Sequence, residues 1–296
     1  MSFTEDLVEQ VALGTLQELG WRYEDPLSIA PDGPNKRRVS NGDVVLGGLL
    51  EDAARRLNPD IPDEALQNAL RQVQISETPS LIEENRRIHR LLVDGIDVEY
   101  RRPDGSIKGD KVRLIDFANP ANNDFMVTNQ FTVVEGGYNR RPDVVAFVNG
   151  LPLVVIELKN AASENATTTD AFHQLQTYKS QIPSLFRTNA ALITSDGLLA
   201  RIGSLSAGED RFMPWRTVTG AQDDFTPEGP KEMDTLLRGG CSPNGSCSWC
   251  ATSQCSVTKA TAFLRSLAVI TSFTARAKHW QAPLTRLAWM VTERSV

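Results

Sequence analysis

The sequence predicts an α/β fold in which helices flank a central mixed sheet, and three observations lead to it. Apolar residues recur at helical spacing through much of the first 92 residues. From Val98 onward the pattern changes to short β-rich runs separated by turn residues. Two of these runs, Val144–Val148 and Leu153–Leu158, are separated at Asn149-Gly150, a strong hairpin signal because both residues tolerate positive φ.

Four helices are expected before the first strand. An apolar stripe over Thr4–Leu19 predicts the first, with Thr4 as its N-cap and Gly20 as its stop. A Pro/Gly/Asn-rich loop follows from Asp25 to Gly42. The remaining helices are expected over Val44–Leu57, Pro62–Gln74 and Leu81–Leu92, the second with proline at its start, where a helix tolerates one.

The strand region is expected to form one largely antiparallel or mixed sheet that includes the 144–158 hairpin. Its earlier strands are predicted over Val98–Arg101, Val112–Asp116 and Met126–Val134. A helix over Asp170–Ser180 comes next. Two further short strands complete the pattern, at Ala190–Thr194 and Leu198–Ile202, on either side of the turn Ser195-Asp196-Gly197.

Composition describes an ordinary globular chain. Its 296 residues, 41% hydrophobic and 23% charged, allow one large domain or two modest ones. A net charge of −6 argues against a generally basic nucleic-acid coat, but not against a nuclease whose carboxylates need a metal before phosphate can approach. No run reaches the ~18–20 apolar residues of a membrane helix, and the N-terminus lacks signal-peptide features. We therefore expect a cytoplasmic protein with no membrane partner.

The 144–158 hairpin carries charges that suggest chemistry. Asp143 stands at the mouth of its first strand, and Glu157 and Lys159 leave the same face of its second strand. Charges set among apolar strand residues are costly unless they are paired or bound to a cation. Two carboxylates can hold Mg²⁺, and a lysine beside them can orient water and offset charge on a phosphate. The alternative is a salt-bridged Glu/Lys pair on a half-exposed strand.

The residues around this hairpin resemble a known family. The segment R-R-P-D-V-V-A-F-V-N-G-L-P-L-V-V-I-E-L-K, residues 140–159, is similar to the nuclease core of the restriction (R, or HsdR) subunit of type I restriction-modification enzymes. That family belongs to the PD-(D/E)xK nucleases, so the resemblance implies a restriction-endonuclease-like fold. It extends over residues 1–240, is strongest from 120 to 217, and includes N-N-D-F-M-V-T-N-Q-F, A-F-H-Q-L-Q-T-Y, S-D-G and R-F-M-P-W-R.

The resemblance assigns roles to individual residues. It makes Asp143 and Glu157 metal ligands, with Leu158 also at the metal, and Lys159 the catalytic lysine. Gln174 and Tyr178 match the family's Q-x-x-x-Y element, which supports the active site and DNA contact.

Two further groups of residues have candidate roles. Glu9 is the candidate for a first-helix carboxylate that reaches towards the metal; the alternative is a solvated helix acid. Lys36, Arg37 and Arg38 are three adjacent cations on a loop. They can grip a phosphate backbone or simply be solvated.

The function implied is that of a Mg²⁺-dependent DNA endonuclease, a site-specific deoxyribonuclease that hydrolyses phosphodiester bonds. Double-stranded DNA and the modification and specificity subunits are the expected partners. ATP is expected for the full-length family, but the chain contains no G-x-x-x-x-G-K-[ST] loop to bind it. We therefore expect the chain alone to be weak or inactive. The alternative function is a catalytically silent scaffold that keeps the nuclease fold to bind DNA or partner subunits.

The domain organisation is predicted as an endonuclease domain over residues 1–225, a linker over 226–240 and an atypical tail over 241–296. The tail is rich in Ser and Thr and holds all four cysteines. It carries a net charge of +5, so the first 240 residues carry −11 and the two parts sum to the −6 of the whole chain. In the family a motor domain should begin here, and our hypothesis is that the tail is frame-shifted and poorly ordered. A zinc-binding module is the alternative, although the cysteine spacing matches zinc sites poorly.

Overall fold

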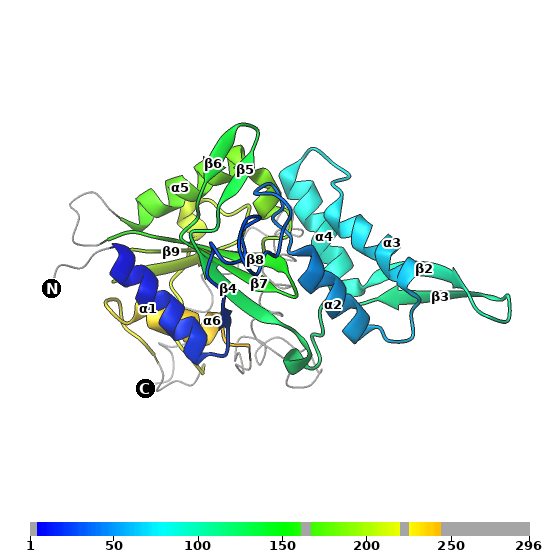
Figure 1. Ribbon diagram of the computed structural model, residues 1–296. Helices are drawn as coiled ribbons and strands as arrows, with labels where there is room; N and C mark the ends of the chain where they lie inside the picture. Colours follow the sequence, from blue (N-terminus) through cyan, green and yellow to red (C-terminus); the bar gives the residue numbers. More distant parts are fainter. Residues whose placement is uncertain (1–4, 161–166, 220–224, 244–296) are drawn as a thin grey trace, which may run out of the picture.

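The computed structural model describes residues 5–160, 167–219 and 225–243 (Figure 1). Its centre is a mixed six-stranded sheet in the order β1-β4-β7-β8-β9-β10. The β1/β4 and β8/β9 pairs are parallel and the other pairs are antiparallel. The strands are β1 (Arg22–Tyr23), β4 (Phe125–Asn129), β7 (Val144–Val148), β8 (Leu151–Leu158), β9 (Ala191–Ser195) and β10 (Ala200–Gly203). The predicted α/β class with a central mixed sheet is confirmed.

Helices cover both faces of this sheet. On one face α1 (Glu5–Glu18) and α6 (Glu232–Gly240) contact each other, and α5 (Thr168–Gln181) packs on β8 and β9 from the other face (Figure 1). Three short 3₁₀ turns lie at Pro120–Asn122, Pro183–Phe186 and Glu209–Arg211. Within the described ranges, none of the helices has both the length and the apolar character needed to cross a bilayer.

A separate lobe extends from the turn end of the central hairpin. It consists of the three helices and the two-stranded sheet on the right of Figure 1. These elements are α2 (Gly47–Leu57), α3 (Asp63–Gln74), α4 (Leu81–Asp94), β2 (Ile96–Arg101) and β3 (Ile107–Val112). A second small sheet, β5 (Val133–Glu135) with β6 (Tyr138–Arg140), lies near α5.

The strands of the central hairpin are buried on both faces. Val144, Ala146 and Val148 belong to the apolar cluster beneath α1 and α6, whereas Val145 and Phe147 belong to the cluster beneath α5. Every residue of β7 and β8 is buried as a result. A strand covered on both faces has a continuous apolar run instead of an alternating pattern, as the sequence of this hairpin has.

The hairpin turn forms where Asn149-Gly150 predicts it. Asn149 has φ of 50° and Gly150 has φ of 79°. A Cβ on Gly150 would lie 2.5 Å from the carbonyl oxygen of Leu46, so only glycine fits. The buried Asn149 side chain donates to the carbonyl of Leu114 (2.8 Å) and accepts from the N–H of Asp124 (2.7 Å). These bonds tie the turn to the chain that leads into β4.

The structure corrects the predictions made for the strands before the hairpin. β3 ends at Val112, so the strand predicted over Val112–Asp116 is wrong. β2 and β3 pair only with each other and do not join the central sheet. The strand predicted over Met126–Val134 breaks after Asn129, because Gln130 has a φ of 47° that a continuous strand cannot hold. The helix predicted over Val44–Leu57 begins at Gly47.

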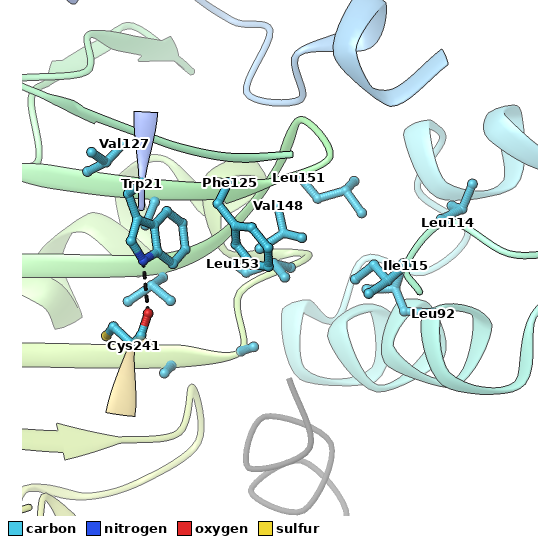
Figure 2. Packing of buried hydrophobic residues seen from close by; sticks show 14 of the residues in the cluster. Trp21, Leu92, Leu114, Ile115, Phe125, Val127, Val148, Leu151, Leu153 and Cys241 are labelled. Carbon is cyan, nitrogen blue, oxygen red and sulfur yellow. Dashed lines mark hydrogen bonds between the residues drawn. The ribbon is translucent and has the colours of Figure 1, made fainter. Parts of the chain in front are cut away.

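Residues 226–240 are not simply a linker, because α6 occupies 232–240 and belongs to the core. Its Glu232 is fully buried, accepts from the N–H of Ala200, and forms ion pairs with Arg201 and Arg216. Just after α6, the carbonyl of Cys241 accepts a hydrogen bond from the indole of Trp21 (2.8 Å; Figure 2). These contacts join the end of the domain to its beginning.

The tail hypotheses fall outside the described residues. Of its four cysteines only Cys241 is described, and it is buried among apolar side chains. The zinc module and the frame shift concern residues 241–296, of which only 241–243 are described, so each stays a prediction.

Candidate active site

The hairpin register brings Asp143 and Glu157 together. β7 and β8 are antiparallel with Val144 opposite Ile156, so Asp143 and Glu157 occupy the next opposed position. Both lie on the α5 side of the sheet, since Val145 and Val155 belong to the apolar cluster there. Side chains at opposed positions have Cβ atoms about 4.5–5.5 Å apart. Asp143 is 8% exposed and Glu157 is 0% exposed. The two carboxylates therefore share one sheltered site.

Lys159 completes the charged cluster. Its Nζ atom lies 2.9 Å from Oε1 of Glu157. Glu157 is fully buried in β8, which runs between β7 and β9 in the sheet. This position excludes a half-exposed strand, one part of the alternative that the sequence left open. A buried ion pair is weak evidence for a stability role, because desolvation costs about as much as the pairing returns.

Leu158 contributes through its main chain. Its side chain is buried in the apolar cluster on the opposite face of the sheet. Its N–H donates to Oδ2 of Asp143 at 2.7 Å and so fixes that carboxylate. Any contact of Leu158 with a metal would come from main-chain atoms, because the side chain has no donor atom.

The available donor set suits a magnesium ion. In the described part of the chain, no group of three or more His, Cys, Asp or Glu side chains lies close enough to hold a metal. The hairpin instead brings together two carboxylates, Asp143 and Glu157. Mg²⁺ is typically held by one or two carboxylates and keeps several waters, whereas structural zinc takes four Cys or His ligands. The residues present fit Mg²⁺.

Glu9 is not a solvated helix acid. It is buried in α1, where its Oε1 accepts from the amide of Asn129 (2.6 Å) and its Oε2 from the amide of Gln130 (2.7 Å). The same Gln130 amide lies 3.3 Å from Oδ1 of Asp143. Glu9 is therefore linked to Asp143 through one side chain. Our sequence reasoning assigned no role to Asn129 or Gln130, although both lie in the N-N-D-F-M-V-T-N-Q-F segment.

Gln174 and Tyr178 border the same site from α5. The Gln174 amide donates to the Tyr178 hydroxyl at 2.6 Å, and that hydroxyl lies 3.5 Å from the carbonyl of Arg141. Burial raises the pKa of Tyr178 above its ordinary value, and the charges of Glu157 and Asp143 raise it further. The phenol is therefore a protonated hydrogen-bond donor beside the two carboxylates.

The basic trio does not form one cationic surface. Arg38 is 5% exposed, donates to the carbonyl of Thr132 (2.7 Å) and lies 4.0 Å over the ring of Phe131. Burial lowers the pKa of Arg38 to about 10. Arg37 pairs with Glu24 through two hydrogen bonds, and Lys36 is exposed. The expectation that all three grip phosphate is wrong for Arg38, because the loop packs this residue against the chain after β4.

A groove opens beside the carboxylates, between β6 and α5. Its volume is about 750 Å³. Our sequence reasoning gave no role to most of its lining, although two of these residues open the R-R-P-D motif. The groove is lined by Asn139, Arg140, Arg141, Asp170, His173, Gln174, Thr177 and Tyr178.

Comparison with known proteins places the chain in a family. The family model described as "Type I restriction enzyme R protein N terminus" matches residues 2–211. The type I restriction enzyme HindI endonuclease subunit of Haemophilus influenzae is 40% identical over 236 residues, 79% of this chain and 22% of that protein. The putative type I restriction enzyme MjaIXP endonuclease subunit of Methanocaldococcus jannaschii is 33% identical over 220 residues, 73% of this chain and 21% of that protein.

A shorter match involves the type I restriction enzyme SsaAORF53P endonuclease subunit of Staphylococcus saprophyticus, which is 40% identical over 88 residues, 29% of this chain and 9% of that protein. The two longer matches each span about a fifth of the length of the relative. The family model covers well over half of the chain, and the fold around it is the mixed sheet flanked by helices that a restriction-endonuclease-like domain has. The chain belongs to the family of type I restriction enzyme R protein N-terminal regions.

Proposed function

We propose that this chain is the Mg²⁺-dependent DNA endonuclease domain of a type I restriction R subunit and hydrolyses phosphodiester bonds. The observation that carries the proposal is the meeting of Asp143, Glu157 and Lys159 on one sheltered face of the hairpin. The relatives' names support it, because each is called an endonuclease subunit. The corresponding activity is that of a site-specific deoxyribonuclease, and the corresponding location is the cytoplasm.

Each residue of the proposed site has a distinct task. Asp143 and Glu157 would hold the Mg²⁺, and the Leu158 N–H keeps the Asp143 carboxylate in its orientation. Bound Mg²⁺ polarises a phosphoryl oxygen and lowers the pKa of a coordinated water. Lys159, held beside Glu157, would place a positive charge against the phosphate as negative charge develops there.

The surrounding polar groups support these residues. Glu9 and Gln130 restrain Asp143 from one side. The Tyr178 phenol, whose pKa burial raises further above neutral pH, stays protonated and can donate a hydrogen bond to a carboxylate or a phosphate. Gln174 fixes the orientation of this phenol.

Partners complete the proposed activity. The chain holds no Walker A loop and spans about a fifth of the relatives' length, so we assign ATP-driven translocation to regions outside it. Sequence selection on double-stranded DNA is assigned to the modification and specificity subunits. Without these parts the domain is expected to nick DNA slowly.

The proposal is tested by nicking of supercoiled plasmid in Mg²⁺ and in EDTA, with long incubations at high protein concentration. We expect slow nicking in Mg²⁺ alone, and a rate lower by about 10²–10³-fold for Lys159→Ala, because a preorganised charge at the phosphate is lost. The matched control is Lys111→Ala, which removes an exposed lysine of β3 and should leave the rate unchanged.

Two results would count against the nuclease proposal. Equal nicking by Lys159→Ala and the wild type would remove the lysine from the site. Absence of both nicking and Glu157-dependent Mg²⁺ or Mn²⁺ binding in calorimetry would instead favour the catalytically silent scaffold.

A further inference from the structure

We propose that the groove between β6 and α5 binds the sugar–phosphate backbone next to the scissile bond, with Arg141 as its main phosphate contact. The inference rests on the proposed nuclease function and adds to it a place for the DNA strand.

The groove has two walls, formed by different elements of the fold. One wall is the end of β6 and the residues that follow it, and the other is a face of α5. Arg140 donates to the side chain of Gln181 at the end of α5, so the two walls are tied together. The Tyr178 hydroxyl, held by Gln174, borders the groove on the side of the carboxylates.

The cationic group available in this groove is Arg141. It is exposed, and among the described residues no acceptor for its guanidinium is found, although its carbonyl is near the Tyr178 hydroxyl. Arg140 differs, because its guanidinium is engaged by Gln181 and by the carbonyl of Asn139. An exposed guanidinium for which the described residues supply no acceptor can bind a phosphate through two parallel N–H···O hydrogen bonds.

The remaining lining favours an anion. Asp170 is the one acidic residue of the lining, and its carboxylate already accepts from the N–H and hydroxyl of Thr167 at the start of α5. His173 is exposed on the same helix and can donate a hydrogen bond to a phosphate oxygen, whereas the Thr177 hydroxyl donates to the carbonyl of His173 (3.1 Å). The first 240 residues carry a net charge of −11, whereas the groove lining has two arginines and one aspartate. The groove is therefore locally more positive than the rest of this region.

The position of the groove selects a nucleic-acid strand over a free anion. Arg141 stands two residues before Asp143, and Tyr178 lies close enough to Glu157 and Asp143 for their charges to raise its pKa. Phosphates of one strand recur about every 3.4 Å along the duplex axis. A strand with one phosphate at the carboxylates can therefore place a neighbouring phosphate near Arg141.

The test measures binding of a short fluorescein-labelled duplex, and of its labelled single strand, by fluorescence anisotropy over a range of salt concentrations, with Ca²⁺ present as an oxygen-seeking cation that neutralises the carboxylates. For Arg141→Gln we expect weaker binding and a slope of log K against log salt that is shallower by about 0.9 for duplex or about 0.7 for single strand, as for one lost phosphate contact. Comparison of the two probes shows which form occupies the groove. The control is Arg71→Gln, an exposed arginine of α3 outside the groove lining, which should bind as the wild type does.

Failure of this inference is distinguishable from failure of the proposed function. If Arg141→Gln keeps the affinity and salt slope of the wild type, or if the wild type binds neither probe, the groove assignment is overturned, while Mg²⁺-dependent nicking still reports on the nuclease. If the slope changes as expected but the wild type shows neither nicking nor Glu157-dependent metal binding, the groove stands and the nuclease proposal fails. Thermal unfolding of Arg141→Gln should match the wild type, because the side chain is exposed.

Discussion

Replacing Asp143 with asparagine is expected to reduce Mg²⁺-dependent nicking to the level measured in EDTA. The change removes one of the two carboxylates available to the ion, and asparagine carries no charge with which to hold it. A loss of at least about 10³-fold corresponds to about 4 kcal/mol of transition-state stabilisation. The fold should survive, because the asparagine side-chain oxygen can still accept the N–H of Leu158.

The matched control for this substitution is Asp97→Asn. Asp97 is an exposed aspartate of β2 that pairs only weakly with Lys111, so its loss should leave nicking unchanged. Unfolding curves of both variants check that the proteins remain folded. Undiminished nicking by Asp143→Asn would show that the carboxylate is not needed and would remove the metal site from this hairpin.

The second large effect concerns stability: Glu232→Gln should lower the free energy of unfolding by about 3 kcal/mol. Breaking one side of a buried ion pair typically costs about 3–5 kcal/mol, and the partners here, with 20% and 22% of their side-chain surface exposed, favour the lower end. Glutamine keeps the shape of the side chain but removes the negative partner of Arg201 and leaves Arg216 with the longer, 3.8 Å contact to Glu228. The contact between α6 and β10 should weaken as a consequence.

Urea unfolding of the purified protein measures this effect as a lower midpoint. The control is Asp234→Asn on the same helix, whose half-exposed ion pair with Arg238 should contribute less than about 1 kcal/mol. Equal midpoints for Glu232→Gln and the wild type would show that α6 is not anchored through Glu232.

The centre of the fold was predictable because its determinants are local. Asn149-Gly150 specifies a turn that few other residues could form, and the β-rich runs on either side specify the strands. Once the hairpin is closed, the period of two places Glu157 and Lys159 on one face and brings Asp143 opposite Glu157. The site could therefore be predicted from a continuous stretch of sequence.

The features that were missed depend on contacts between distant segments. The α6 helix, expected as part of a linker, is stabilised by Arg201 and Arg216, which no local pattern connects to Glu232. The break after Asn129 comes from the positive φ of Gln130, whose amide bridges Glu9 and Asp143. A run of basic residues predicts an exposed cationic surface. It does not show that the Arg38 side chain packs over the ring of Phe131, which is distant in the sequence.

Anomalous diffraction from a crystal of the protein grown with Mn²⁺, a stand-in for Mg²⁺ with a measurable signal, locates the ion directly. The proposed site predicts one strong peak next to the carboxylates of Asp143 and Glu157, and its loss in crystals of Asp143→Asn. A manganese-loaded crystal with no peak between these two side chains would contradict the assignment of the hairpin as the catalytic metal site.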